Sequence, residues 1–288
     1  MMTHNIYRQF LFIGLVFILP GLLQMTYGQG ELINDSIFSP SVNKVKSFNI
    51  WIPNVEDKNE LPVIYMLHGA WGNYNNWTDK TDILKHPLAE QVIMVFIDGE
   101  NSFYVNSAYH ADQRYEDYII NDLIPTIEDK YAIDSRKRGI AGLSMGGYGS
   151  LYLAFRHPDV FTFCGSLSGA VSIPLMSYLW QEDKENKELV RDIVKNAFGL
   201  PDTSIYKNYD LMYILEQNQD IDIPYVYMVH GKQDGFKDFL PAHRLLVEKL
   251  SHLDVKHEYQ EVDGKHNWTF WNNHIGGVLT AYHSVISK

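Results

Sequence analysis

Apolar residues occur along this chain in short runs with little polar alternation, separated by segments that have helical spacing. Seven runs are interpreted as strands, over residues 47–53, 61–69, 91–99, 138–144, 161–169, 223–231 and 256–264. Helical spacing is found over residues 115–131, 145–157, 239–252 and 268–286. Strands that are apolar on both faces are typical of a parallel sheet with both faces covered. The pattern therefore predicts an α/β fold with a mostly parallel central sheet and helices on both faces.

Two parts of the chain do not follow this alternation. Residues 10–23 are an uncharged apolar run, preceded by Arg8 and followed by small residues. This layout is typical of a cleaved secretory signal peptide, here over 1–28, because the run is short for a membrane span. Residues 171–222 contain the charged stretch QEDKENKELVRD, interpreted as a solvated helical face. We expect 29–288 to be a single domain, with this second part as an insertion.

Composition limits the partners and the compartment. The chain has 288 residues, a net charge of −11 and a single cysteine, Cys164. An exported protein without an intramolecular disulfide indicates a bacterial periplasm or exterior. The acidic balance disfavours nucleic acid and, after signal cleavage, membrane surfaces as partners, and it leaves the oligomeric state open. The histidines form neither an H-E-x-x-H pattern nor a Cys/His cluster, so we expect no metal and no cofactor.

Polar residues at the carboxyl ends of the strands are the candidates for chemistry, because ligands bind there in parallel sheets. One predicted strand ends in GLSMGG, which fits G-x-S-x-G between a strand and a helix. In that context Ser144 lies on a sharp turn above the sheet, as a nucleophile would. The N–H of Met145 begins the helix, where unpaired donors and the helix dipole favour negative charge. The alternative is a glycine-rich turn that only allows close packing.

A serine nucleophile needs a base, and the base needs an acid that orients it. In α/β-hydrolases these residues follow the order serine, acid, histidine. His266 comes after the last predicted strand and is the expected base. Asp234 comes just beyond the preceding strand and is the expected acid, with Asp238 as the second choice.

The second oxyanion donor is expected in the loop after an early strand, which has the sequence LHGAWG. Either Ala70 or Trp71 can supply the N–H, and Ala70 is preferred. His68 is interpreted as a residue that braces this loop rather than as a base.

Together these motifs resemble the esterase D-like branch of α/β-hydrolases. That branch includes short-chain tributyrin-type esterases, S-formylglutathione hydrolases, and the feruloyl and acetyl-xylan esterases of carbohydrate esterase family one. The resemblance covers most of residues 45–285 and rests on HGAWGNYNNW, NSFYVNSAY, GLSMGGYGS, GKQDGF and DGKHNW. It implies the same nucleophile, acid, base and oxyanion donors. It further implies that Tyr104 and Trp77 lie near the substrate, and Trp71 is added as a substrate-binding candidate.

The resulting hypothesis is a secreted serine carboxylesterase that hydrolyses short-chain or carbohydrate-linked esters through an acyl-enzyme on Ser144. A thioesterase similar to S-formylglutathione hydrolase and an acyltransferase on the same scaffold are alternatives, and export counts against a glutathione thioester. A non-enzymatic carbohydrate-binding protein is an alternative from another class. It would stack sugars on four tryptophans, Trp71, Trp77, Trp180 and Trp268.

Overall fold

The computed structural model describes residues 30–55, 61–131, 133–172, 188–199, 205, 207–218 and 221–288. The predicted signal peptide lies outside these residues. The expected insertion over 171–222 is described only in part, and Trp180 falls in the part that is left out. The single-domain organisation with an insertion therefore stays a prediction.

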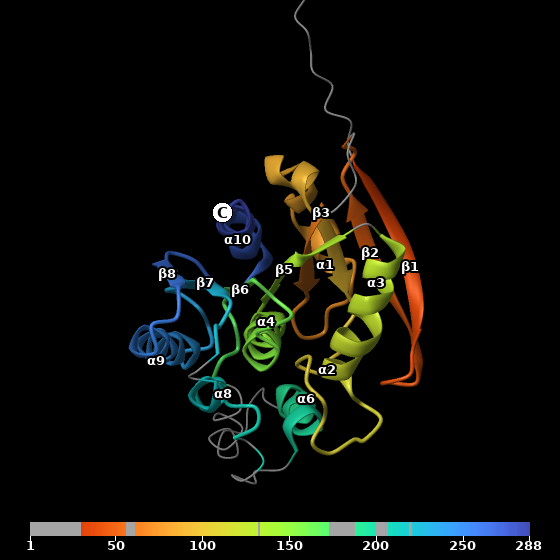
Figure 1. Ribbon diagram of the computed structural model, residues 1–288. Coiled ribbons are helices and arrows are strands. Elements are labelled where there is room, and N and C mark those ends of the chain that lie inside the picture. Colours follow the sequence, from red (N-terminus) through yellow and green to blue (C-terminus); the bar gives the residue numbers. More distant parts are fainter. Residues whose placement is uncertain are drawn as a thin grey trace, which may run out of the picture.

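An eight-stranded sheet forms the centre of the molecule, with the strand order β1-β2-β4-β3-β5-β6-β7-β8 (Figure 1). Its strands are β1 (Glu31–Ser39), β2 (Lys44–Ile52), β3 (Leu61–Leu67), β4 (Ile93–Ile97), β5 (Ile133–Leu143), β6 (Phe163–Leu167), β7 (Tyr225–Gly231) and β8 (His257–Val262). β2 pairs antiparallel with β1 and β4, and all other neighbouring strands are parallel. The expected α/β fold with a mostly parallel sheet is confirmed.

The sequence pattern did not reveal β1, which pairs along its whole length with β2 at the edge of the sheet. Its residues alternate between more and less exposed positions. The apolar residues Leu32 and Phe38 occupy exposed positions, whereas Asp35 is on the partly buried face. These inversions hide the period-2 alternation by which a half-buried strand is detected.

Helices cover both faces of the sheet, as expected. One face carries α2 (Tyr115–Asp117), the π-helical turn η3 (Tyr118–Leu123), α3 (Ile124–Lys130), α4 (Met145–Arg156), α6 (Glu188–Phe198), α8 (Leu211–Gln217) and α9 (Phe239–His252). The other carries α1 (Asn76–Lys80), the 3₁₀ turns η1 (Ile83–Lys85) and η2 (Pro87–Gln91), and α10 (Trp268–Ile286). Alternate residues of β4 contribute to the two separate cores, which explains why the strand is apolar throughout.

The predicted helices over 239–252 and 268–286 coincide with α9 and α10. The helix expected over 115–131 is instead divided into α2, η3 and α3. Pro125 lies in the first turn of α3, and because proline has no N–H it cannot continue the hydrogen-bond ladder of a preceding helix. Within the described part of the chain, no helix has the length and apolar character that crossing a membrane requires.

Candidate active site

Ser144 lies between the end of β5 and the start of α4, in a strained backbone conformation. Its φ angle is 52°, in the left-handed region that residues with a Cβ avoid, and its N–H donates to Leu167 O at 3.0 Å. The glycines around it have a steric reason. A Cβ on Gly142 would lie 2.3 Å from Gly146 O, and one on Gly146 would lie 2.5 Å from Leu67 O. Only glycine lets this turn fit beneath β3, so these glycines provide the close packing that the alternative interpretation also requires, and the contacts of Ser144 must distinguish the two.

The structure brings Ser144, His266 and Asp234 together from three separate strand ends. His266 Nε2 lies 2.9 Å from Ser144 Oγ, and His266 Nδ1 lies 2.8 Å from Asp234 Oδ2. The carboxylate accepts from Nδ1–H, so Nε2 carries the lone pair that accepts the serine proton. This is the hydrogen-bonded chain that allows an imidazole to activate a hydroxyl.

Asp234 is held as a buried carboxylate. Its side chain is 2% exposed, and its Oδ1 accepts the Phe236 N–H at 2.9 Å. Burial acts to raise the pKa of Asp234, but the hydrogen bond and charge of His266, together with the Phe236 N–H, hold that pKa below its usual value. Asp238, the second choice for the acid, is exposed at the N-cap of α9.

The loop after β3 distinguishes between the two expected oxyanion donors. The N–H of Trp71 donates to Asn101 Oδ1 at 2.7 Å. The N–H of Ala70 has no hydrogen-bond acceptor among the described residues. Met145 is the first residue of α4, where N–H groups lack an intrahelical acceptor. Ala70 and Met145 therefore present donors beside Ser144, and all three line one pocket.

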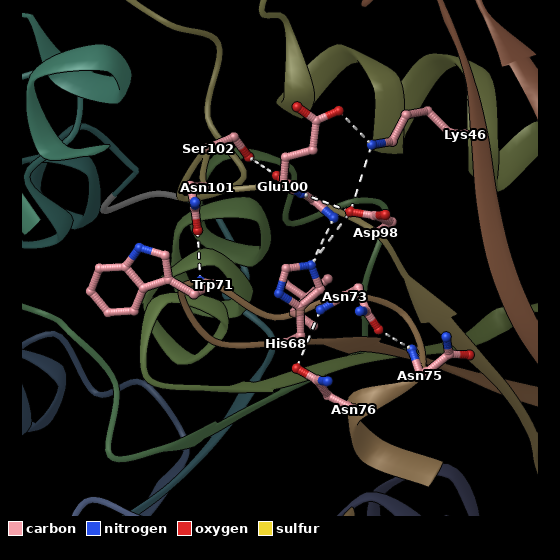
Figure 2. Close-up of polar contacts among 12 residues, drawn as sticks. Lys46, His68, Trp71, Asn73, Asn75, Asn76, Asp98, Glu100, Asn101 and Ser102 are labelled. Atoms are coloured by element: carbon pink, nitrogen blue, oxygen red, sulfur yellow. Dashed lines mark hydrogen bonds and ion pairs between the residues drawn. The ribbon is translucent and has the colours of Figure 1, made fainter. Parts of the chain in front are cut away.

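His68 braces this loop, as expected. It is fully buried, and its Nδ1 lies 2.7 Å from Gly69 O while its Nε2 accepts the Gly99 N–H at 3.1 Å. A carbonyl accepts and a peptide N–H donates, so the ring carries its proton on Nδ1. Figure 2 shows this ring between the loop and a cluster of polar residues around Asp98. Each ring nitrogen contacts a backbone group, and Nε2 also lies 3.7 Å from Asp98 Oδ1, so the ring is held as a brace and not as the base.

A pocket of about 210 Å³ opens at Ser144. Its described lining consists of apolar and aromatic side chains with a few polar groups, and comprises Gly69, Ala70, Trp71, Asn76, Lys80, Phe103, Leu143, Ser144, Met145, Ala170, Ile193, Phe236, Phe239, His266, Trp268 and Trp271. Trp71 is 53% exposed at its edge. The prediction that Trp71 borders the substrate site agrees with this position.

Two of the three substrate-binding candidates lie behind the pocket instead of in its lining. Tyr104 is fully buried and its hydroxyl donates to His68 O at 2.9 Å. Trp77 is 1% exposed and its Nε1–H donates to Leu67 O at 3.1 Å. Both expectations are corrected on this point. The two rings support the backbone of the loop, because a buried aromatic with a polar group needs an internal partner.

Three aromatic residues that were not predicted from the sequence surround His266. Phe236, Phe239 and Trp271 have ring centroids 4.9, 5.9 and 5.1 Å from that of His266. The available signal was their position, since the two phenylalanines follow the acid closely and Trp271 lies in the first turn of the last helix. Among the described residues, no group of three or more His, Cys, Asp or Glu side chains could hold a metal ion.

Comparisons with known proteins identify the family and the fold of the chain. The family model described as "Putative esterase" matches residues 39–281. An acetyl esterase from Caldicellulosiruptor saccharolyticus is 27% identical over 227 residues, 77% of this chain and 84% of that protein. An endo-1,4-beta-xylanase/feruloyl esterase from Xylanibacter ruminicola is 30% identical over 192 residues, 58% of this chain but 26% of that longer protein.

A substrate-bound fluorophosphonate-binding serine hydrolase from Staphylococcus aureus shares the fold. The two chains are 22% identical with a TM-score of 0.76, and the match covers 88% of this chain and 99% of the other. The family model spans most of the chain, and the sheet and helices are those of an α/β-hydrolase. The protein therefore belongs to the esterase family and is an α/β-hydrolase enzyme of the serine carboxylesterase type.

Proposed function

We propose that this protein is a secreted serine carboxylesterase that hydrolyses short-chain or carbohydrate-linked esters through an acyl-enzyme on Ser144. The observation that carries the proposal is the continuous chain of hydrogen bonds from Ser144 Oγ through His266 to the buried Asp234. A hydroxyl is a weak nucleophile, and this chain supplies both the base and the group that orients it.

In the first half of the reaction, Ser144 Oγ attacks the ester carbonyl carbon as its proton passes to His266 Nε2. The carbonyl oxygen becomes an oxyanion, which the N–H groups of Ala70 and Met145 stabilise by hydrogen bonds. Asp234 stabilises the imidazolium through Nδ1 without taking its proton. His266 then gives its proton to the alcohol oxygen, the bond from carbon to that oxygen breaks, and the alcohol leaves.

In the second half, water attacks the acyl-enzyme and gives a proton to His266. The same two N–H groups receive the second oxyanion. Its collapse breaks the bond to Ser144 Oγ, which regains its proton from His266, and the acid is released. The N–H groups, His266 and Asp234 thus act in both halves, and water is the second reactant.

The size and lining of the pocket favour a small acyl group. Its volume of about 210 Å³ is below the ~300–1,000 Å³ of sites for drug-sized ligands. Leu143, Met145, Ala170 and Ile193 provide an apolar surface for an acyl chain. The name of the first relative described above contains an acetyl group, which is of this small size. The name of the second contains the larger, aromatic feruloyl group, which suits the apolar lining but not the small volume.

The alcohol side of the ester is proposed to be a sugar. Trp71 is half-exposed at the pocket and Trp268 is partly buried there, so both present indole surface near Ser144. Indole faces combine apolar area with a polar edge and suit the C–H surface of a sugar ring. This part of the proposal concerns binding and is independent of the acyl-enzyme chemistry.

The reaction is tested with a panel of p-nitrophenyl esters from acetate to decanoate, methyl ferulate, acetylated xylan and S-formylglutathione. We expect the highest kcat/KM on short acyl chains, and a loss of at least about 10³-fold in Ser144→Ala. Equal rates for Ser144→Ala and the unmodified protein would refute the mechanism. Acyl transfer to an added sugar acceptor, in place of release of the free acid, would favour the acyltransferase.

Export is tested by the mass of the mature protein isolated from the periplasm or medium of a bacterial host. The proposal expects removal of residues 1–28. A protein that retains these residues and stays in the cytoplasm would refute the secreted assignment without affecting the esterase chemistry.

A further inference from the structure

The loop between β3 and α1, residues 68–75, is called the oxyanion loop here. Two consecutive peptide groups in it are each held by a side chain. The Gly69 carbonyl is held by His68 Nδ1–H at 2.7 Å, and the Trp71 N–H is held by Asn101 Oδ1 at 2.7 Å. In a trans peptide the C=O and N–H point in opposite directions. The bond to Gly69 O therefore turns the Ala70 N–H away from His68, and the bond to Trp71 occupies the other amide.

Trp71 has a backbone conformation that needs such support. Its φ angle is 57°, in the left-handed region that is disfavoured for a residue with a large side chain. Figure 2 shows the Asn101 amide pointing at the Trp71 backbone while the indole extends away from the polar cluster. Asn101 Oδ1 thus holds the backbone of the residue whose indole lines the pocket, and the Gly72 N–H supports the same loop by donating to Gly69 O at 3.1 Å.

Asn101 is placed by a rigid loop that also holds His68. Ser102 Oγ donates to Gly99 O at 2.6 Å and accepts the Tyr104 N–H at 3.0 Å. The Gly99 N–H donates to His68 Nε2, and the Tyr104 hydroxyl donates to His68 O. The loop after β4 therefore supports both peptide groups. Asn101 accepts the Trp71 N–H directly, and the Gly99 N–H holds the His68 ring that donates to Gly69 O.

Ion pairs anchor this loop to the neighbouring strand β2. The Lys46 side chain is 4% exposed, and its Nζ lies 2.9 Å from Glu100 Oε1 and 3.6 Å from Asp98 Oδ1. Lys44 Nζ also lies 3.1 Å from Glu100 Oε2. The residues on both sides of Asn101 are thus tied down, so the side chain is presented from a fixed backbone (Figure 2).

We propose that Asn101 is a positioning residue for the oxyanion hole. By accepting the Trp71 N–H it stabilises the loop in the form that leaves the Ala70 N–H as the donor beside Ser144. Asn101 acts through the backbone and does not touch the substrate. This inference rests on the proposed function, in which Ala70 supplies one of the two oxyanion donors.

The test compares Asn101→Ala, which removes the acceptor, with Asn101→Asp, which keeps an acceptor oxygen at the same reach. Asn73→Ala is the matched control, because Asn73 Oδ1 also accepts a backbone N–H, that of Asn75 at 2.9 Å, in the same loop. Each protein is assayed for kcat and KM on p-nitrophenyl acetate and for binding of a trifluoromethyl ketone, which forms an oxyanionic adduct with the serine. Unfolding temperatures are measured in parallel.

Full removal of an oxyanion donor costs about 10²–10³-fold in rate, so a misplaced donor is expected to cost less. We expect Asn101→Ala to lower kcat by about 10–100-fold and to weaken the ketone by a similar factor, with KM within about 3-fold. Asn101→Asp should retain most of the kcat and most of the affinity for the ketone, and Asn73→Ala should retain kcat. A merely structural role would lower the unfolding temperature without this split between kcat and KM.

The proposal is overturned if Asn101→Ala keeps the kcat of the unmodified protein, if Asn101→Asp is as impaired as Asn101→Ala, or if Asn73→Ala loses as much. Should Asn101→Ala fail to fold, Asn101→Leu, which keeps a similar side-chain size but has no acceptor, takes its place and is expected to show the same fall in kcat. Ser144→Ala distinguishes a failure of the role proposed for Asn101 from a failure of the proposed function. If it abolishes activity while Asn101→Ala does not change it, only the role of Asn101 fails. If it leaves activity intact, the proposed function fails.

Discussion

His266 and Asp234 are joined by a short contact, with Nδ1 2.8 Å from Oδ2 and an aspartate side chain that is 2% exposed. Because water scarcely reaches this pair, the carboxylate alone determines which nitrogen of His266 carries the proton. The other nitrogen then faces Ser144 Oγ at 2.9 Å. The contact thus links the tautomer of the ring to its capacity to accept the serine proton.

Asp234→Asn should lower kcat by about 10³–10⁴-fold with a small change in KM, because an amide no longer imposes the Nδ1–H tautomer. The measurement is steady-state kinetics on p-nitrophenyl acetate. Asp238→Asn is the matched control and should keep the activity of the unmodified protein, since Asp238 is exposed at the N-cap of α9. The opposite ranking of the two variants would identify Asp238 as the acid.

Trp71→Ala should raise KM for sugar esters more than for p-nitrophenyl acetate, because it removes indole surface from the edge of the pocket. An effect of about 10-fold corresponds to roughly 1.4 kcal/mol of lost binding. Kinetics on an acetylated oligosaccharide and on p-nitrophenyl acetate provide the comparison. Equal changes on both substrates would argue against a contact with the sugar.

Tyr104→Phe should lower the free energy of unfolding by about 1–3 kcal/mol, because it leaves the buried His68 carbonyl without its donor. The preference among acyl chain lengths should not change, since Tyr104 is not among the described residues that line the pocket. Denaturant titration and the p-nitrophenyl ester series measure the two quantities. Tyr109→Phe, at a residue that is 60% exposed, serves as the control for hydroxyl loss. A changed chain-length preference in Tyr104→Phe would restore this residue to the substrate site.

A pair of buried histidines should make the fold sensitive to mild acid. His230 and His243 are fully buried with ring centroids 4.5 Å apart, and their burial lowers the pKa of His230 to about 4 and that of His243 to about 3. Both values lie below the usual 6.5, so the unfolded chain binds protons that the folded protein excludes. The stability that these neutral rings provide is complete above pH 6.5 and is lost as the pH falls toward 4.

The groups that face the two rings act in different directions. Asp234 and Glu261 favour the charged form of both rings, and the Phe239 carbonyl favours that of His243. His230 disfavours the charge of His243, and His266 disfavours that of His230. Tyr259 stacks on His243 at a centroid distance of 6.1 Å. Burial outweighs the carboxylates in both cases, so the folded protein resists protonation of the pair.

Denaturant titrations at pH 7, 6 and 5 should therefore show a falling free energy of unfolding, with a slope that approaches about 1.4 kcal/mol per pH unit for each ring. His243→Leu should flatten this slope relative to the unmodified protein. Burial acts to raise the pKa of Glu116, but its contacts with His157, Arg156 and Tyr152 lower that pKa to about 2. The stability that Glu116 contributes is therefore lost mainly below about pH 4.5, outside the range of these titrations. Parallel slopes for both proteins would show that His243 does not contribute.

The sequence by itself determined the features that depend on neighbours along the chain. Apolar runs without alternation require burial on both faces, so they indicated the parallel strands, and helical spacing placed α9 and α10 at their observed bounds. The turn at Ser144 was equally local, because the glycines that it needs are adjacent in sequence. The order of serine, acid and histidine at strand ends then selected Asp234 and His266, since parallel strands bring their carboxyl ends to one edge.

Only the tertiary structure decided how the aromatic and polar groups divide between the pocket and its support. Trp71 lines the pocket while Trp77 and Tyr104 lie behind it, although all three are aromatic residues that follow the ends of β3 or β4. The side chain that holds the Trp71 N–H belongs to Asn101, on a loop after another strand. Such contacts depend on the register of the sheet and on the direction of each peptide group, because distances between remote segments are set by packing and not by spacing along the chain.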